Sequence, residues 1–279
     1  MELFVINTGF FKLDGGAMFG VVPKSLWNRF NPADENNLCT WAMRCLLLKE
    51  GNRLMLIDTG LGDKQDEKFF SHYYISGDSL ETSLGNAGFH PDDITDVFLT
   101  HLHFDHVGGA TMYDKDKTSI VPRFKNATYW SNEAHWNWAK YPNAREKASF
   151  LKENLEPLEK SGQLKFLKKG ETPWEGMEIL YVDGHTEQQM LPIIHYKGKV
   201  LAYVADLLPS LGHIPLPWIM SYDVRPLETL KEKKTFLDIA VENNYIVFFE
   251  HDPVHECCTL KVTEKGVRAD KTFSLKEIL

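Results

Sequence analysis

The sequence contains no long uninterrupted run of apolar residues among its 279 positions. A membrane-spanning helix needs about 20 consecutive, mainly apolar residues, so we expect no membrane partner. The first nine residues, Met1 to Gly9, also lack the basic start, the long apolar stretch and the small-residue cleavage site of a signal peptide. A cytoplasmic location is therefore the default expectation, although a processed precursor would look the same.

An excess of positive charge is also absent. Lys and Arg number 31 against 39 Asp and Glu, which gives a formal net charge of −8. Proteins that bind the phosphate backbone of nucleic acids need a broad basic surface, whereas the lysine-rich stretch around Lys165, Lys168 and Lys169 is short and interrupted. We expect a small-molecule substrate and no nucleic acid. No pattern reports the oligomeric state, and a homodimer stays open.

Cysteine is scarce, and the spacing of the cysteines does not match that of cysteine metal sites. The four cysteines are Cys39, Cys45, Cys257 and Cys258, with no Cys-x-x-Cys pair among them. This excludes the disulfide framework of small secreted proteins and the usual cysteine zinc sites. Neighbouring Cys257 and Cys258 cannot easily form a disulfide with each other without strain. We expect buried or half-buried thiols.

A linker rich in Gly, Ser or Pro is missing too, so we predict one α/β domain over residues 1–279. Apolar stretches and helical spacing alternate along the chain, which indicates two sheets packed face to face with helices outside. The irregular segment from Pro209 to Pro226 is expected to be a functional loop near a pocket. Predicted strands are 3–7, 41–49, 54–58, 97–99, 177–182, 191–196, 200–205 and, as the final core strand, 245–249; predicted helices are 79–87, 130–138, 146–160 and 226–243.

The densest chemical signal is Thr100-His-Leu-His-Phe-Asp-His-Val-Gly-Gly109, directly after an apolar stretch. Four potential metal ligands fall within six residues: His101, His103, Asp105 and His106. Alternate residues of an extended segment point the same way, so the first two histidines can share one ion while the last two ligands face a neighbouring ion. Imidazole and carboxylate suit zinc and related divalent ions. A polar surface loop that happens to hold histidines is the weaker interpretation.

This motif resembles that of the metallo-β-lactamase superfamily, whose hallmark is His-x-His-x-Asp-His after a strand. The resemblance covers nearly the whole chain, because four further motifs follow the family's order: Leu56-Ile-Asp-Thr-Gly60, Asp183-Gly-His-Thr186, Ala205-Asp206 and Phe249-Glu-His-Asp252. It implies a four-layer αββα sandwich of two mixed sheets flanked by helices. It also implies one ion on His101, His103 and His185, a second on Asp105, His106 and His251, and Asp206 bridging both.

Two divalent ions, with zinc favoured and manganese, iron or cobalt as alternatives, could share a water and lower its pKa towards 7. The expected activity is therefore hydrolysis by a bridging hydroxide, with Asp105 orienting it and carrying its proton. Asp58 is expected to support a ligand histidine or merely to cap a turn. Tyr222 or His213 could supply a further proton from the irregular loop, and packing roles stay open for both. Met18, Phe19 and Trp27 could wall an apolar pocket or belong to the core.

Within the superfamily the sequence is most similar to the acyl-homoserine lactonase and phosphotriesterase branch. The resemblance implies an ester-like bond of a small molecule as the target: a lactone, a carboxylic ester or an organophosphate. Two departures weaken a tyrosine-assisted lactonase mechanism, because Leu207-Leu-Pro209 replaces the usual tyrosine and Thr186-Glu-Gln-Gln189 replaces Thr-Pro-Gly-His. A β-lactamase, a thioester hydrolase and a non-catalytic metal-binding protein are the alternatives.

Overall fold

The structure is a computed structural model that describes residues 1–278. The chain divides into two compact units, each assembled from separate stretches of sequence. Unit 1 comprises Met1–Gly9 and Met43–Pro173, and unit 2 comprises Phe10–Ala42 and the chain from Trp174 onward. That residues 1–279 form one domain stays a prediction.

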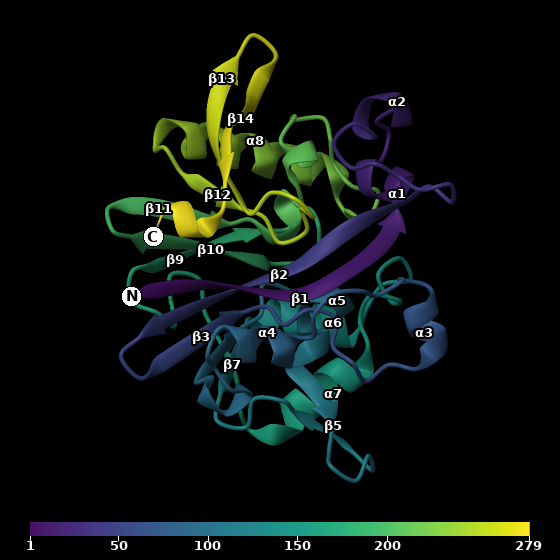
Figure 1. Ribbon diagram of the computed structural model, residues 1–279, viewed down its shortest axis with the longest axis vertical. Coiled ribbons are helices and arrows are strands. Elements are labelled where there is room, and N and C mark those ends of the chain that lie inside the picture. The colour runs from purple at the N-terminus through teal and green to yellow at the C-terminus, as the bar shows by residue number, and fades with distance from the viewer. Residues whose placement is uncertain (279) are drawn as a thin grey trace. The chain divides into compact units, whose positions relative to one another are not determined.

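Most of unit 1 is built around a six-stranded mixed sheet (Figure 1). Strand β3 is antiparallel to β2, while the pairs β3–β4, β4–β7 and β7–β8 are parallel. Strands β1 and β2 extend into unit 2. In spatial order the strands are β1 (Glu2–Asp14), β2 (Leu38–Glu50), β3 (Arg53–Ile57), β4 (Asp96–Phe98), β7 (Thr128–Ser131) and β8 (Leu164–Phe166).

The core of unit 1 combines apolar side chains of these strands with those of helices. Leu56 and Val97 are fully buried on adjacent strands, in one cluster with Leu84 of a helix and Trp136 of another. Burial of this apolar surface is the main source of the unit's stability. The helices are α3 (Glu67–Ser71), α4 (Leu80–Asn86), α5 (Phe104–Val107), α6 (Glu133–Lys140) and α7 (Lys152–Ser161), and a small hairpin joins β5 (Thr111–Tyr113) to β6 (Ile120–Pro122).

Unit 2 is built around a second six-stranded mixed sheet, in which only β11 and β12 are paired in parallel. Two mixed sheets with helices confirm the predicted α/β class. The strands are β9 (Met177–Val182), β10 (Gln189–Tyr196), β11 (Lys199–Tyr203), β12 (Ile246–Phe248), β13 (Cys257–Thr263) and β14 (Gly266–Phe273), and the helices are α1 (Gly15–Phe19), α2 (Lys24–Trp27) and α8 (Pro226–Glu242).

Two predicted helices of unit 1 were wrong in part. The first, predicted from Trp130, begins only at Glu133, where the Asn132 side chain accepts a hydrogen bond from the third residue of the helix. The preceding Tyr129 is buried and pairs with Val97 in the sheet. Tertiary pairing thus overrides the helical spacing of this segment. The second, predicted from Glu146, begins at Lys152.

The predicted core strand 245–249 corresponds to β12, whose three residues are all buried, but it is not the last strand of the sheet. Strand β12 is followed by the hairpin of β13 and β14, drawn in yellow in Figure 1. Cys257 and Cys258 at the start of this hairpin are buried against β12. All four cysteines are buried free thiols, as predicted.

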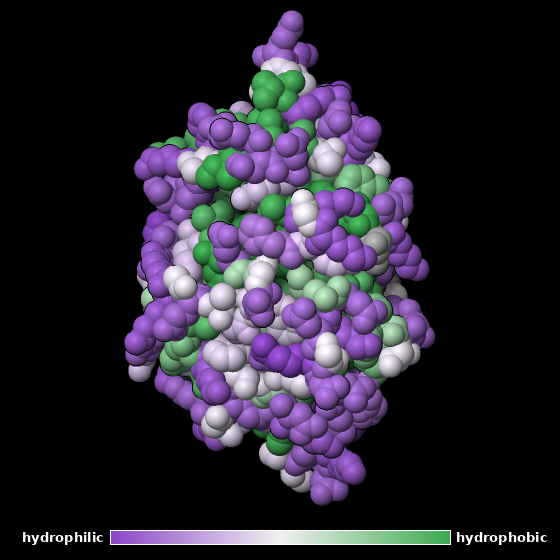
Figure 2. Space-filling model, turned by 90° about the vertical axis from the view of Figure 1, so that its left-hand side faces the viewer, coloured by the Kyte–Doolittle hydropathy of each residue, from purple (hydrophilic) through white to green (hydrophobic). Residues whose placement is uncertain are grey.

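The surface of the molecule is mixed in character. The face drawn in Figure 2 is mostly hydrophilic, with smaller hydrophobic areas between the polar side chains. No helix within residues 1–278 is long and apolar enough to cross a membrane.

Candidate metal centre

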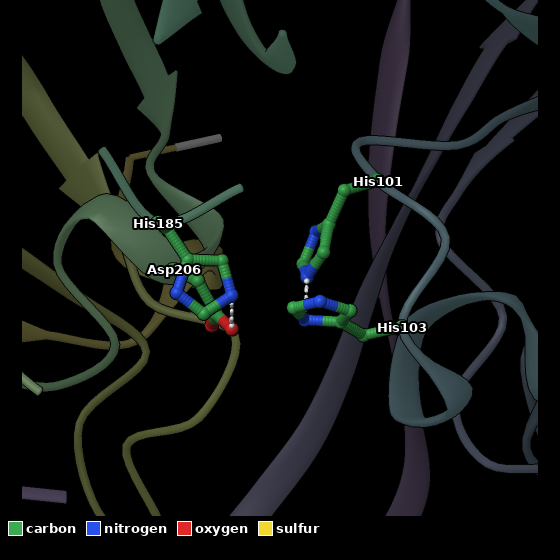
Figure 3. Close-up of side chains that lie close together, drawn as sticks. All are labelled: His101, His103, His185 and Asp206. Carbon is green, nitrogen blue, oxygen red and sulfur yellow. Dashed lines mark hydrogen bonds and ion pairs between the residues drawn. The ribbon is translucent and has the colours of Figure 1, made fainter. Parts of the chain in front are cut away.

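The histidine motif of unit 1 leaves β4 and turns into the short helix α5. His101, His103, Asp105 and His106 are all buried. His101 Nε2 lies 3.1 Å from His103 Nδ1, as Figure 3 shows, and the ring centroids of His101 and His106 are 3.9 Å apart. Buried imidazole and carboxylate groups are costly unless they are hydrogen-bonded or coordinate a metal. Within unit 1 the predicted motif therefore forms a compact set of donors whose chemistry fits divalent ions.

Asp58 holds the end of this motif from the end of β3. Its carboxylate accepts hydrogen bonds from the Thr100 backbone N–H at 2.8 Å and the Thr100 hydroxyl at 2.6 Å, and it lies 3.1 Å from His106 Nδ1. An ionised carboxylate only accepts hydrogen bonds, so the proton of His106 is on Nδ1 and the lone pair is on Nε2. This is the tautomer that a ligand histidine needs.

Two further side chains of unit 1 support the motif and were not singled out from the sequence. Glu146 is buried, and its Oε1 lies 3.5 Å from His103 Nε2. His135 accepts a hydrogen bond from the Leu102 backbone N–H through Nε2 at 2.9 Å. Each of these two residues lies more than thirty positions along the chain from the residue that it contacts. No local sequence pattern therefore indicates either contact.

Unit 2 contains the other three predicted ligands, and they converge. His185 Nε2 lies 3.0 Å from one carboxylate oxygen of Asp206, and His251 Nε2 lies 3.0 Å from the other. Figure 3 shows the His185 ring beside the Asp206 carboxylate. All three side chains are buried. One carboxylate between two imidazoles is the arrangement expected of a bridging ligand.

The outer nitrogens of both histidines are also held. His185 Nδ1 lies 2.9 Å from Asp223 Oδ1, and His251 Nδ1 lies 2.8 Å from the Ala42 carbonyl oxygen. These contacts orient each Nε2 towards Asp206. Burial alone would lower the pKa of His185, but the charges of Asp206 and Asp223 outweigh it and raise the pKa to about 10. The environment of His185 is therefore built to stabilise a cation.

The backbone around these ligands is fixed by helix α8 and by an unusual turn. Glu232 of α8 accepts hydrogen bonds from the N–H groups of Asp183 (2.6 Å) and Gly184 (3.0 Å), the two residues before His185. Ala205, just before Asp206, has a φ of +36°, outside the regions that residues with a side chain prefer. Such conformations occur where a functional residue must be aimed.

Tyr222 and His213, for which a proton-supplying role and a packing role were both left open, differ in their surroundings. His213 is buried, with Nδ1 at 2.9 Å from the Ser210 hydroxyl and Nε2 at 2.9 Å from the Met18 carbonyl oxygen. Burial lowers the pKa of His213 to about 3. Tyr222 is 40% exposed.

Met18, Phe19 and Trp27, which were expected to wall a pocket or to belong to the core, are all buried. Phe19 stacks on Trp27 with ring centroids 5.2 Å apart, and its ring also stacks on His213 at 4.5 Å. These contacts place the three residues in the packed interior of unit 2.

Comparison with known proteins agrees with this chemistry. The model of the family described as "Metallo-beta-lactamase superfamily" matches residues 44–251. An N-acyl homoserine lactonase of Bacillus cereus is 25% identical over 242 residues, which cover 82% of this chain and 87% of the lactonase. The chain is thus homologous to N-acyl homoserine lactonases.

Solved structures show the same fold. A probable metal-dependent hydrolase from Staphylococcus aureus has a TM-score of 0.88 and 27% identity, covering 98% of this chain and 96% of the other. AidC, a dizinc quorum-quenching lactonase, has a TM-score of 0.77 and 26% identity, with 98% and 95% covered. Because the family model matches well over half of the sequence, the chain belongs to the metallo-β-lactamase superfamily of metal-dependent hydrolases.

Proposed function

We propose that this protein hydrolyses a lactone or a similar ester-like bond of a small molecule with the help of two divalent ions, zinc foremost. The observation that carries the proposal is the carboxylate of Asp206, whose two oxygens each face the Nε2 of a different histidine. The proposed ligands are His101, His103, Asp105, His106, His185, Asp206 and His251. The lactonase relatives support the lactone as substrate.

The nitrogen and oxygen donors of the proposed ligands suit divalent ions such as zinc. The histidines offer nitrogen donors whose tautomers are set by Asp58 and Asp223, and Asp206 offers two oxygens. Two ions bound there would supply Lewis acidity towards a substrate carbonyl and would make water acidic enough to react near neutral pH. That combination is what cleavage of an unactivated ester requires.

The chain's own residues would orient groups and move protons. Asp105 is on the first turn of α5, and its carboxylate lies 3.8 Å from His106 Nε2. We propose that it orients the attacking water by accepting a hydrogen bond and then passes the proton towards the leaving oxygen. Tyr222 is the proposed donor to that oxygen because it precedes Asp223, whose carboxylate lies 2.9 Å from the proposed ligand His185. His213 could act in the same step only by giving up one of its two hydrogen bonds.

The test is turnover of the zinc-loaded protein on an acyl-homoserine lactone, an aryl ester, an organophosphate triester, a β-lactam and a thioester. We expect the lactone to be hydrolysed, the activity to disappear with a chelator, and zinc to restore it. Absence of turnover on every substrate, with two ions bound, would instead identify a metal-binding protein without this activity.

Variants of unit 2 give the matched comparison. Asp206→Asn should lower kcat/KM by at least about 100-fold, since one oxygen that faces a histidine becomes an amide. His195→Ala is the control, because His195 is on β10 of the same unit and its exposed ring lies 2.9 Å from Glu178. Equal losses in the two variants would contradict the assignment of Asp206.

A further inference from the structure

The segment from Asp58 to Lys64 packs directly behind the end of the ligand motif in unit 1. A Cβ atom added to Gly108 would lie 2.1 Å from the Leu61 carbonyl oxygen, and one added to Gly109 would lie 2.2 Å from the Thr59 carbonyl oxygen. The two backbones are therefore as close as glycine permits. The Gly109 N–H also donates to the Gly60 carbonyl at 2.9 Å.

Two buried basic side chains donate hydrogen bonds to the carbonyl groups of these glycines, and burial lowers the pKa of Lys64 from 10.5 to about 7. Lys64 Nζ donates a hydrogen bond to the Gly108 carbonyl, and Arg123 Nε donates one to the Gly109 carbonyl at 2.9 Å. Lys64 is only 5% exposed and Arg123 only 6%. Burying a cation costs several kcal/mol unless its donors are satisfied. The fold thus places two buried basic groups on the consecutive carbonyls of Gly108 and Gly109, directly after the end of α5 at Val107.

Arg123 connects the Gly109 carbonyl to helix α4 and to the segment 58–64. Its Nη1 donates to Glu81 of α4 at 2.5 Å, and its Nη2 donates to Asp63 of the 58–64 segment. The planar guanidinium can hold three partners in a fixed geometry, which an ammonium group cannot. Gly109 is therefore tied at once to α4 and to the segment that also includes Asp58.

We propose that Lys64 and Arg123 are positioning residues that fix helix α5 and, with it, the ligands Asp105 and His106. The helix has only four residues, too few to be stable alone. Its carboxyl end carries partial negative charge, which cations stabilise. Thr59 holds the same end, since its N–H and its hydroxyl both donate to the His106 carbonyl at 2.8 Å.

This inference rests on the proposed function, and it predicts that the two ions will be affected unequally. Asp105 and His106 are on the helix that the two basic side chains hold, whereas His101 and His103 precede it. Loss of either basic side chain should therefore weaken the binding of the ion assigned to Asp105 and His106 more than that of the ion assigned to His101 and His103.

The experiment titrates zinc into chelator-stripped wild type, Lys64→Met, Arg123→Met and Arg123→Lys, with bound metal counted after dialysis. Wild type should bind two ions. Lys64→Met and Arg123→Met should bind one of them with about 10- to 100-fold lower affinity, the size of effect found when a group that orients a ligand is lost. Arg123→Lys should recover part of the lost zinc affinity, because it keeps a basic group but not the planar guanidinium that holds three partners.

Arg53→Met is the matched control in the same unit. Arg53 also contacts a carboxylate and a backbone carbonyl, those of Asp96 and Pro173, each at 3.0 Å. Urea unfolding of the metal-free proteins measures the structural cost of every substitution. A loss of both ions in equal measure, or a loss that Arg53→Met reproduces at the same stability, would overturn the positioning role. Wild type that fails to bind two ions would instead overturn the proposed function.

Discussion

Asp58 combines a strained backbone with three polar contacts. Its φ is +57°, in the left-handed region, and its carboxylate accepts from Thr100 twice and contacts His106 Nδ1. Asparagine tolerates this backbone region but presents an N–H₂ group where Asp58 presents an oxygen. In Asp58→Asn, His106 Nδ1 would have to accept, which moves the imidazole proton to Nε2, the atom that we propose binds the metal.

We therefore expect Asp58→Asn to fold but to bind zinc about 10- to 100-fold more weakly. Zinc titration measures the affinity, and urea unfolding of the metal-free protein measures the fold. Asp96→Asn is the control: Asp96 is also buried and accepts hydrogen bonds from Arg53 and Trp130. Wild-type affinity in Asp58→Asn would show that the tautomer of His106 is not set by this carboxylate.

The cysteine side chains allow a second prediction at the residue scale. Burial raises the pKa of Cys39 to about 11 and raises that of Cys258 as well. Because the thiolate is the reactive form, native protein should not react with a thiol reagent at pH 8. In denaturant all four cysteines should react. Rapid labelling of any cysteine in the native state would contradict this.

Several elements could be predicted from the sequence, and others could not. Short apolar stretches such as 97–99 and the amphipathic spacing of α8 define their elements locally. The boundary between β7 and α6 depends on pairing of Tyr129 with Val97, thirty-two positions away, and no window around Tyr129 contains that information. The β13–β14 hairpin was missed because its strands are rich in polar residues and contain only two buried residues, Cys257 and Cys258.

The residues of the candidate site also differ in whether the sequence could predict them. The histidine motif is dense enough to be found by its spacing, whereas Glu146 and Asp223 become neighbours of ligands only through the tertiary structure. Asp223 lies thirty-eight positions from His185. Its carboxylate looks like any other loop aspartate in the sequence, so only the fold distinguishes it.

Helix α8 packs closely on the turn before His185. A methyl group added at Gly184 is therefore predicted to lower the free energy of unfolding strongly. A Cβ atom added to Gly184 would lie 2.3 Å from the Thr229 backbone nitrogen. We expect Gly184→Ala to lower the free energy of unfolding by about 3 kcal/mol, the upper range for overpacking. Gly85→Ala in α4, where a Cβ meets nothing within 4 Å, should raise it by about 1 kcal/mol. Urea unfolding measures both.

Helix α8 also buries Lys233, whose Nζ donates to the carbonyls of Pro215 (2.9 Å) and Trp218 (2.7 Å). Burial lowers the pKa of Lys233 to about 7 from 10.5. Between these pH values the unfolded chain keeps a proton that the folded chain has released, so the free energy of unfolding rises with pH. Below about pH 7 both states are protonated, and this contribution no longer changes.

We expect metal-free wild type to gain on the order of 2 kcal/mol over Lys233→Met between pH 7 and pH 9, from a maximal slope of about 1.4 kcal/mol per pH unit. Urea unfolding at several pH values measures the difference. Lys234→Met is the control, because Lys234 is exposed and forms a surface ion pair with Asp238. Parallel curves for wild type and Lys233→Met across this window would contradict the assignment.

At the scale of the whole molecule, the proposed ligands are spread over more than half of the sequence and divided between the two units. Ions that bind only the folded chain stabilise it by about 4 kcal/mol at 1,000 times their dissociation constant. We therefore expect a chelator to lower the melting temperature and zinc to restore it. Calorimetry of the wild type and of Asp206→Asn measures this, and an equal response of the two proteins would contradict the ligand assignment.

Each unit draws on two separate stretches of the chain, and this has a consequence during synthesis. Residues 10–42 belong with the chain from Trp174 onward, so these early residues leave the ribosome long before their partners exist. At about 5–20 residues per second, the delay amounts to roughly ten seconds or more, during which the nascent segment has apolar side chains such as Trp27 and Trp41 exposed. Newborn chains of this protein should therefore depend on chaperones until translation ends.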